Sequence, residues 1–127
     1  MTKQANESCP CGGAALAECC GPLLAGEKIA ETAEQLMRSR YCAYALGNEA
    51  YLKSSWHAST RPDESLVDAS IKWIGLEIRS AAQEDAQATV SFVARCRVNG
   101  RGQRLEENSR FIREDGRWYY VDGDFKQ

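Results

Sequence analysis

Apolar residues recur at helical spacing in the first half of the chain. The stretch that begins at Thr32 places its apolar residues on one face of a helix: Leu36, Met37, Tyr41, Tyr44 and Ala45. Thr32 and Gln35 form a capping pair at the start of this helix. We predict that it ends at Gly47 and that two further helices follow over residues 49–56 and 63–70.

The spacing changes to every second position in the second half of the chain. Alternating apolar and polar residues predict four strands, over residues 74–78, 90–98, 105–113 and 118–121. Asn99-Gly100 and Asp115-Gly116 are tight-turn pairs, because both residues of each pair tolerate a positive φ. Helices followed by consecutive strands predict an α+β fold with an antiparallel sheet.

Four of the six cysteines lie close together near the start of the chain: Cys9, Cys11, Cys19 and Cys20. Two thiol pairs joined by a short loop can converge on one tetrahedral ion, for which Zn²⁺ is the first candidate. Four thiolates leave no open position, so the ion would be structural. Crossed disulfides, redox-active thiols and an iron–sulfur cluster remain open alternatives. We interpret Cys42 and Cys96, which fall within a predicted helix and a predicted strand, as small buried apolar residues.

Composition limits the classes of protein to which the chain can belong. It has 127 residues, 43% hydrophobic and 27% charged, which fits one domain over 31–127 behind a small metal-binding segment and connector over 1–30. The net charge of −2 gives no general attraction to nucleic acid. No apolar run approaches membrane-spanning length, and residues 1–8 lack the apolar core of a signal peptide. We therefore expect a reducing, cytoplasmic location without membrane contact.

The cysteine pattern resembles a known motif. Cys9-Pro10-Cys11-Gly12 followed by Cys19-Cys20-Gly21 is similar to the SEC-C motif, which is known from the tail of the preprotein translocase motor, where it binds zinc and helps to recruit a chaperone. Further stretches resemble the small bacterial YchJ-like proteins: residues 36–41, 56–57, 91–95, 109–111 and 118–123. The loop between the cysteine pairs is one residue shorter than usual and lacks the usual lysines.

The resemblance implies a fold and a set of partners. It implies a SEC-C zinc knuckle joined to an NTF2-like cone, in which a few helices lie over a curved antiparallel sheet. A protein partner would bind through the knuckle, and a small apolar ligand would occupy the cone. A homodimer through the open face of the sheet is a further expectation.

Two functions remain open from the sequence. The first is a non-enzymatic adaptor or binding module with structural zinc. The second is a small-molecule enzyme, similar to an isomerase or a dehydratase, that uses His57 with Glu107 for proton transfer in the cone. The residues that we expect to line such a pocket are Arg40, Trp56, His57, Glu107 and Trp118.

Overall fold

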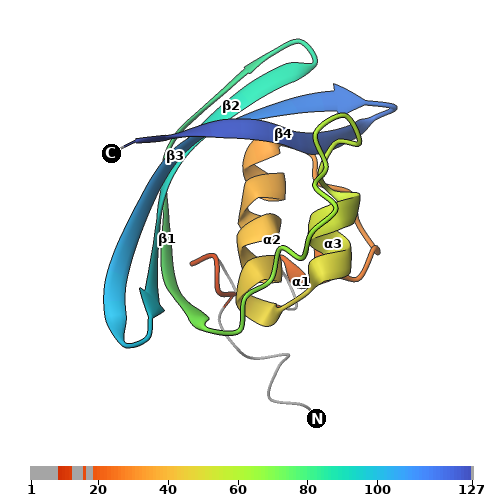
Figure 1. Cartoon of the computed structure of the whole chain (residues 1–127). Helices are drawn as coiled ribbons and strands as arrows, with labels where there is room; N and C mark the ends of the chain where they lie inside the picture. The colour runs from red at the N-terminus through yellow and green to blue at the C-terminus, as the bar shows by residue number, and fades with distance from the viewer. Residues whose placement is uncertain (1–8, 13–15, 17–18, 127) are drawn as a thin grey trace.

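The fold consists of short helices that lie against one curved sheet (Figure 1). The computed structural model describes residues 9–12, 16 and 19–126, so the N-terminal tail and most of the loop between the cysteine pairs lie outside the described residues. The elements are α1 (Gly21–Leu24), α2 (Ala33–Leu46), α3 (Glu49–Ser54), β1 (Ile71–Glu84), β2 (Gln87–Val98), β3 (Arg101–Glu114) and β4 (Arg117–Lys126). Within the described part of the chain, no helix is both long and apolar enough to cross a bilayer.

The main helix, α2, has the ends that its sequence predicts. The Thr32 side chain accepts a hydrogen bond from the backbone N–H of Gln35, and Gly47 closes the helix with a φ of 76°. Glycine adopts this left-handed conformation without steric cost, which explains why the helix stops there. α3 follows directly, and Asn48 caps its first turn by accepting from the N–H of Tyr51 at 3.1 Å.

The four strands form an antiparallel meander in the order β1-β2-β3-β4. Both predicted turns are present, since Asn99 and Asp115 have a φ of 53° and the glycine after each has a φ of 80°. A further turn at Asp85, with a φ of 56°, joins β1 to β2. The strands are longer than predicted, because backbone pairing continues beyond the alternating apolar positions. The sheet curves around α2 (Figure 1).

The predicted third helix is wrong, and the second is shorter than predicted. Residues 63–70 form bends and a turn in place of a helix. The Lys53 ammonium donates to the backbone carbonyls of Pro62 at 2.6 Å and Glu64 at 2.7 Å, and the Asp68 carboxylate accepts from the N–H of Ser70 at 2.9 Å. These contacts engage backbone groups that a helix would need for its own ladder. The short helix α1, within residues 1–30, is an element that the sequence analysis did not predict.

One apolar cluster joins the cysteine segment to the body of the molecule. It includes three of the four N-terminal cysteines, Cys9, Cys11 and Cys20, together with Leu36, Met37 and Cys42 of α2. Val90 and Phe111 of the sheet belong to the same cluster and are almost completely buried. The cysteines therefore lie against the domain core, and the division at residues 30 and 31 stays a prediction.

Candidate metal centre and interior cavity

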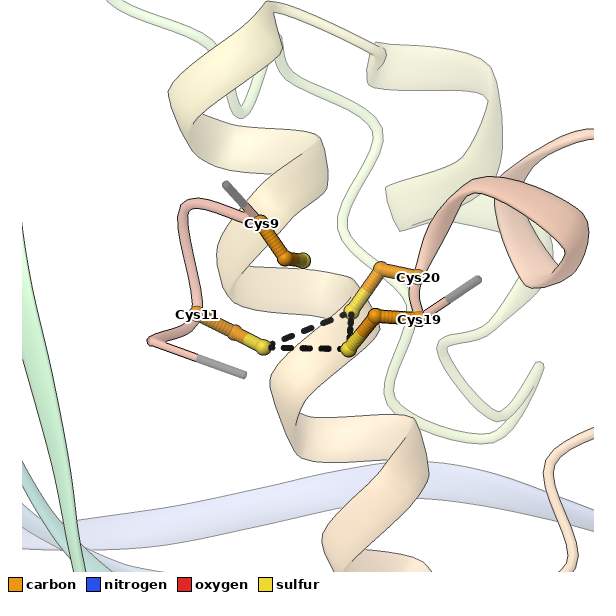
Figure 2. Close-up of side chains that lie close together, drawn as sticks. All are labelled: Cys9, Cys11, Cys19 and Cys20. Carbon is orange, nitrogen blue, oxygen red and sulfur yellow. Dashed lines mark hydrogen bonds between the residues drawn. The ribbon is translucent and has the colours of Figure 1, made fainter. Parts of the chain in front are cut away.

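Two short segments bring the cysteine side chains together. In the first, the N–H of Gly12 donates to the Cys9 carbonyl at 2.9 Å, which forms a tight turn around Cys11, and Gly12 has a φ of 88°. In the second, Cys19 and Cys20 directly precede α1, whose first turn contains Pro22. Proline favours the first turn of a helix, so the sequence itself sets where α1 begins. The two segments face each other, and the side chains of the four cysteines lie between them (Figure 2).

The four sulfur atoms are spaced as the ligands of one ion would be. We call Cys9, Cys11, Cys19 and Cys20 the cysteine cluster, and all four Sγ atoms lie within 4.8 Å of one another. Dashed lines in Figure 2 mark three contacts between these sulfurs. The Sγ–Sγ distances are 3.6 Å from Cys11 to Cys19, 3.7 Å from Cys11 to Cys20 and 3.9 Å from Cys19 to Cys20. A tetrahedral ion with Zn–S bonds of about 2.3 Å needs sulfurs about 3.8 Å apart. The described geometry fits such an ion despite the short loop.

The crowding of the cysteine cluster opposes ionisation of its thiols. Burial, together with hydrogen bonds to Cys11 and Cys9, raises the pKa of the Cys19 thiol to about 11. The hydrogen bond with Cys11 is the main cause of the raised pKa of Cys20. Crowded thiols resist ionising together, and a divalent cation is what allows them to become thiolates at neutral pH.

Two side chains from α2 reach the cysteine cluster. The Arg38 guanidinium donates to the Cys11 carbonyl at 3.1 Å, which places a positive charge at the edge of the cluster. The Cys42 Sγ atom lies 3.2 Å from the Cys9 Sγ atom and is fully buried. The sequence prediction that Cys42 is buried is confirmed, but its contact with the cysteine cluster was missed. No local pattern in the sequence indicates this contact, because the two cysteines are 33 positions apart.

A cavity of about 280 Å³ lies between α2 and the sheet. Three of the five residues expected in a pocket line it: Arg40, Trp56 and Glu107. Most of the remaining wall is apolar: Met37, Tyr44, Trp73, Phe92, Leu105 and Phe125. Phe125 is 63% exposed, so we place the opening of the cavity beside it.

Arg40 is a buried cation at the inner end of the cavity. It is 2% exposed, and its guanidinium donates to the Leu52 carbonyl at 2.9 Å and the Ser55 hydroxyl at 2.6 Å. The ring centroids of Trp56 and Tyr120 lie 5.2 Å and 4.6 Å from its central carbon, within cation–π range. Burial lowers the pKa of Arg40. Arginine nevertheless stays charged in proteins, so the cavity carries a fixed positive group.

Glu107 is the buried acid of the same cavity. Its Oε2 atom accepts from the Ser109 hydroxyl and the Tyr120 hydroxyl, each at 2.8 Å. A Cβ atom at Gly123 would overlap the Glu107 carboxylate, so the glycine leaves the space in which this acid lies. Burial raises the pKa of Tyr120, which therefore remains a hydrogen-bond donor at neutral pH.

The other two expected pocket residues lie outside this cavity. The His57 Nε2 atom is 3.1 Å from a Glu114 carboxylate oxygen, and its Nδ1 atom is 2.7 Å from the Ser59 hydroxyl. The expected pairing of His57 with Glu107 is therefore wrong. The cause is strand alternation: Tyr120 points into the cavity with Glu107, whereas the neighbouring Tyr119 points away from it and packs against the His57 ring. Trp118 is buried at another site, and its indole N–H donates to the Glu31 carbonyl at 3.3 Å.

Comparison with known proteins assigns the family. A family model described as the YchJ middle NTF2-like domain matches residues 32–123. A UPF0225 protein from Chromobacterium violaceum is 54% identical, with 95% of each chain covered. A UPF0225 protein from Ralstonia nicotianae is 50% identical, with 92% of this chain and 90% of the relative covered.

Solved structures agree with this assignment. The solution structure of a SEC-C motif containing protein from Rhodopseudomonas palustris superposes with a TM-score of 0.84 at 33% identity, covering 94% of this chain and 99% of that one. A SEC-C motif containing protein from Psychrobacter arcticus, at 23% identity and a TM-score of 0.80, shares the fold over 99% of this chain and 86% of that one. The chain therefore belongs to the YchJ-like family, with an NTF2-like domain behind a cysteine cluster consistent with a SEC-C knuckle.

Proposed function

We propose that this protein is a non-enzymatic binding module of the cytoplasm, in which a structural Zn²⁺ ion fixes the knuckle on the NTF2-like domain. The observation that carries the proposal is the spacing of the four Sγ atoms of the cysteine cluster. The ion would supply folding free energy, since a segment this short buries too little apolar surface to fold alone. Cys9, Cys11, Cys19 and Cys20 would hold it and leave no position for a substrate.

A groove beside the knuckle supports binding of a protein partner. It has a volume of about 420 Å³, and its walls come from α1, the connector, α3 and β4. Ile29, which is 50% exposed, gives it an apolar wall, and Lys28 and Arg117 give it positive charge. The partner chemistry that fits is an extended segment with an apolar residue beside an acidic one. Leu23 of α1 also lines the groove, and loss of the zinc would displace it and weaken binding of the partner.

Native mass spectrometry tests the metal directly. Protein purified under reducing conditions without chelator or added metal should carry one zinc ion per chain. Cys11→Ser should lose it, because Cys11 is buried at the centre of the cysteine cluster. Cys96→Ser, on β2, is the matched control and should keep it. A wild-type chain without stoichiometric metal, or with disulfides or an iron–sulfur cluster in its place, would refute the proposal. The same spectrum shows whether the expected homodimer forms.

A small ligand in the interior cavity is the second candidate function. Its support is the combination of apolar walls with the buried Glu107 and Arg40, an arrangement common in small-molecule sites. Each carboxylate oxygen can accept more than one hydrogen bond, so Glu107 keeps capacity for a donor on a ligand. The class that fits is a small apolar molecule with one hydrogen-bond donor. An enzyme of the isomerase or dehydratase kind would use Glu107 as its base.

Thermal-shift screening with pooled small metabolites separates these alternatives. A ligand of the cavity should raise the melting temperature of wild-type protein and of His57→Ala, whose side chain lies outside the cavity. Glu107→Gln should weaken binding by about 10-fold, as expected for the loss of a charge-assisted hydrogen bond. Turnover of the ligand that disappears in Glu107→Gln would establish an enzyme, whereas binding without turnover would favour the adaptor. A ligand whose affinity is unchanged in Glu107→Gln but lost in His57→Ala would show that the ligand binds outside this cavity.

A further inference from the structure

We propose that Cys42 is a fifth thiol of the metal centre, which donates its S–H to the Cys9 thiolate and so ties the ion to the main helix of the domain. This inference rests on the proposed zinc site. Cys42 is separated from Cys9 by 33 positions in the sequence and belongs to a different element, so only the folded chain brings the two thiols together.

Cys42 lies beside the four proposed ligands but is not one of the four described thiols whose Sγ atoms all lie within 4.8 Å of one another. Cys42 Sγ lies 3.2 Å from Cys9 Sγ, whereas the three contacts within the cysteine cluster span 3.6–3.9 Å. The longer distances are near the edge of a zinc–sulfur tetrahedron, about 3.8 Å. The Cys42–Cys9 contact is the shortest of the four and is within hydrogen-bonding distance for two sulfurs. Structural zinc takes four ligands, so a fifth thiol keeps its proton and acts as a donor.

The charge of the metal centre requires such donors. Zn²⁺ with four thiolates carries a formal charge of about −2, and burying that charge is costly unless hydrogen-bond donors surround it. Cys9 is only 3% exposed, so bulk water has little access to its sulfur. Cys42 is fully buried and has no exposure to solvent of its own, which leaves its S–H directed to a protein acceptor.

The helix α2 supplies this support from one face. Arg38 and Cys42 are four residues apart and therefore project from the same side of the helix. Arg38 donates to the backbone carbonyl of Cys11 at 3.1 Å, and Cys42 contacts the Cys9 sulfur. Both members of the first cysteine pair are thus held by α2. The consequence is that the ion is linked to the domain through α2 as well as through the connector.

The test compares zinc affinity between three variants and the wild-type chain. Cys42→Ala removes the donor and should weaken zinc binding by about 10- to 100-fold, the usual effect of losing a hydrogen bond to a ligand. Cys42→Ser keeps a donor and should recover most of the affinity. Cys96→Ala removes the buried thiol of β2, which is not part of the cysteine cluster, and its zinc affinity should match that of wild type. Affinities are measured by competition with a chromophoric chelator under reducing conditions.

Cobalt substitution shows whether Cys42 is a donor or a ligand. The sulfur-to-cobalt charge-transfer band should keep its full intensity in both Cys42 variants, because all four thiolates remain. A loss of about one quarter of that intensity would make Cys42 a ligand and overturn the proposal. An unchanged zinc affinity in Cys42→Ala would overturn it as well.

Two controls keep the result decisive. If Cys42→Ala cannot be purified folded, Cys42→Val refills the space without a donor and is judged by the same affinity and cobalt criteria. A wild-type chain that binds neither zinc nor cobalt would refute the proposed function itself. A wild-type chain that binds zinc, with a Cys42→Ala variant that binds it equally well, would refute only the role of Cys42.

Discussion

Gly21 shows how a single residue shapes the backbone around the cysteine cluster. A Cβ atom at this position would lie 2.6 Å from the backbone oxygen of Leu16. The same oxygen accepts a hydrogen bond from the N–H of Cys19 at 3.2 Å. Gly21 therefore lets the chain that carries Cys19 and Cys20 return closely on the segment before it. The requirement is for space, since Gly21 is not among the residues with a positive φ.

At this scale we predict that Gly21→Ala weakens zinc binding by about 10-fold or more. The added methyl group must displace backbone, and such overpacking typically costs about 1–3 kcal/mol. Zinc competition against a chelator measures the change. Gly102→Ala is the matched control, because a Cβ atom there meets no atom within 4 Å. Equal affinities for the two variants would show that the close approach to Leu16 does not shape the site.

The helix α2 is the element that connects the two candidate sites. One part of its surface, with Arg38 and Cys42, supports the cysteine cluster. Another part, with Arg40 and Tyr44, forms a wall of the cavity. Ser39 lies between these and shares a hydrogen bond of 2.6 Å with the Tyr51 hydroxyl of α3. A change that loosens α2 should therefore affect both the metal and the cavity.

At the scale of the element we predict that Thr32→Ala lowers the free energy of unfolding by about 1 kcal/mol. The Thr32 hydroxyl is the N-cap of α2 and accepts from the N–H of Gln35 at 3.1 Å. Urea denaturation of the zinc-bound protein measures the loss. Thr32→Ser keeps the hydroxyl and should remain close to wild type. A Thr32→Ala chain as stable as wild type would mean that solvent satisfies the first turn equally well.

The whole molecule combines an apolar core with a cluster of cysteine thiols. The domain has an apolar core between α2 and the sheet, with Val90, Phe92 and Phe111 buried on the strands. The cysteine segment adds to that core three buried thiols whose arrangement fits an ion. Apolar burial persists when a metal is removed, whereas the folding free energy that a bound ion would supply is lost with the ion.

At the scale of the molecule we predict that a chelator loosens the cysteine segment and leaves the domain folded. Amide hydrogen exchange should become faster at residues 9–12 and 19–24, while the four strands keep their protection. Cys11→Ser without chelator should show the same pattern. Global unfolding on chelation would show that the boundary at residues 30 and 31 is drawn in the wrong place and that the ion stabilises the entire fold.

Local features of the sequence predicted much of the fold because they act over a few neighbouring residues. The caps of α2, the alternation in the strands and the turns at Asn99 and Asp115 are all of this kind, and the structure confirms them. The four cysteines could be selected as metal ligands for the same reason, since their spacing alone allows the two pairs to converge. Residues 63–70 were mispredicted because their side chains and backbone engage Lys53 and one another in place of a helical ladder.

Contacts between distant segments required the tertiary structure. Whether His57 faces Glu107 or Glu114 depends on which face of the curved sheet lies against the end of α3. The spacing of residues along the chain does not show which face that is. The approach of Cys42 to Cys9 likewise depends on how the cysteine segment packs on α2. Residue spacing therefore determined the elements and the candidate ligand set. The packing of elements far apart in the chain decided which side chains form the cavity and which thiol lies against the cysteine cluster.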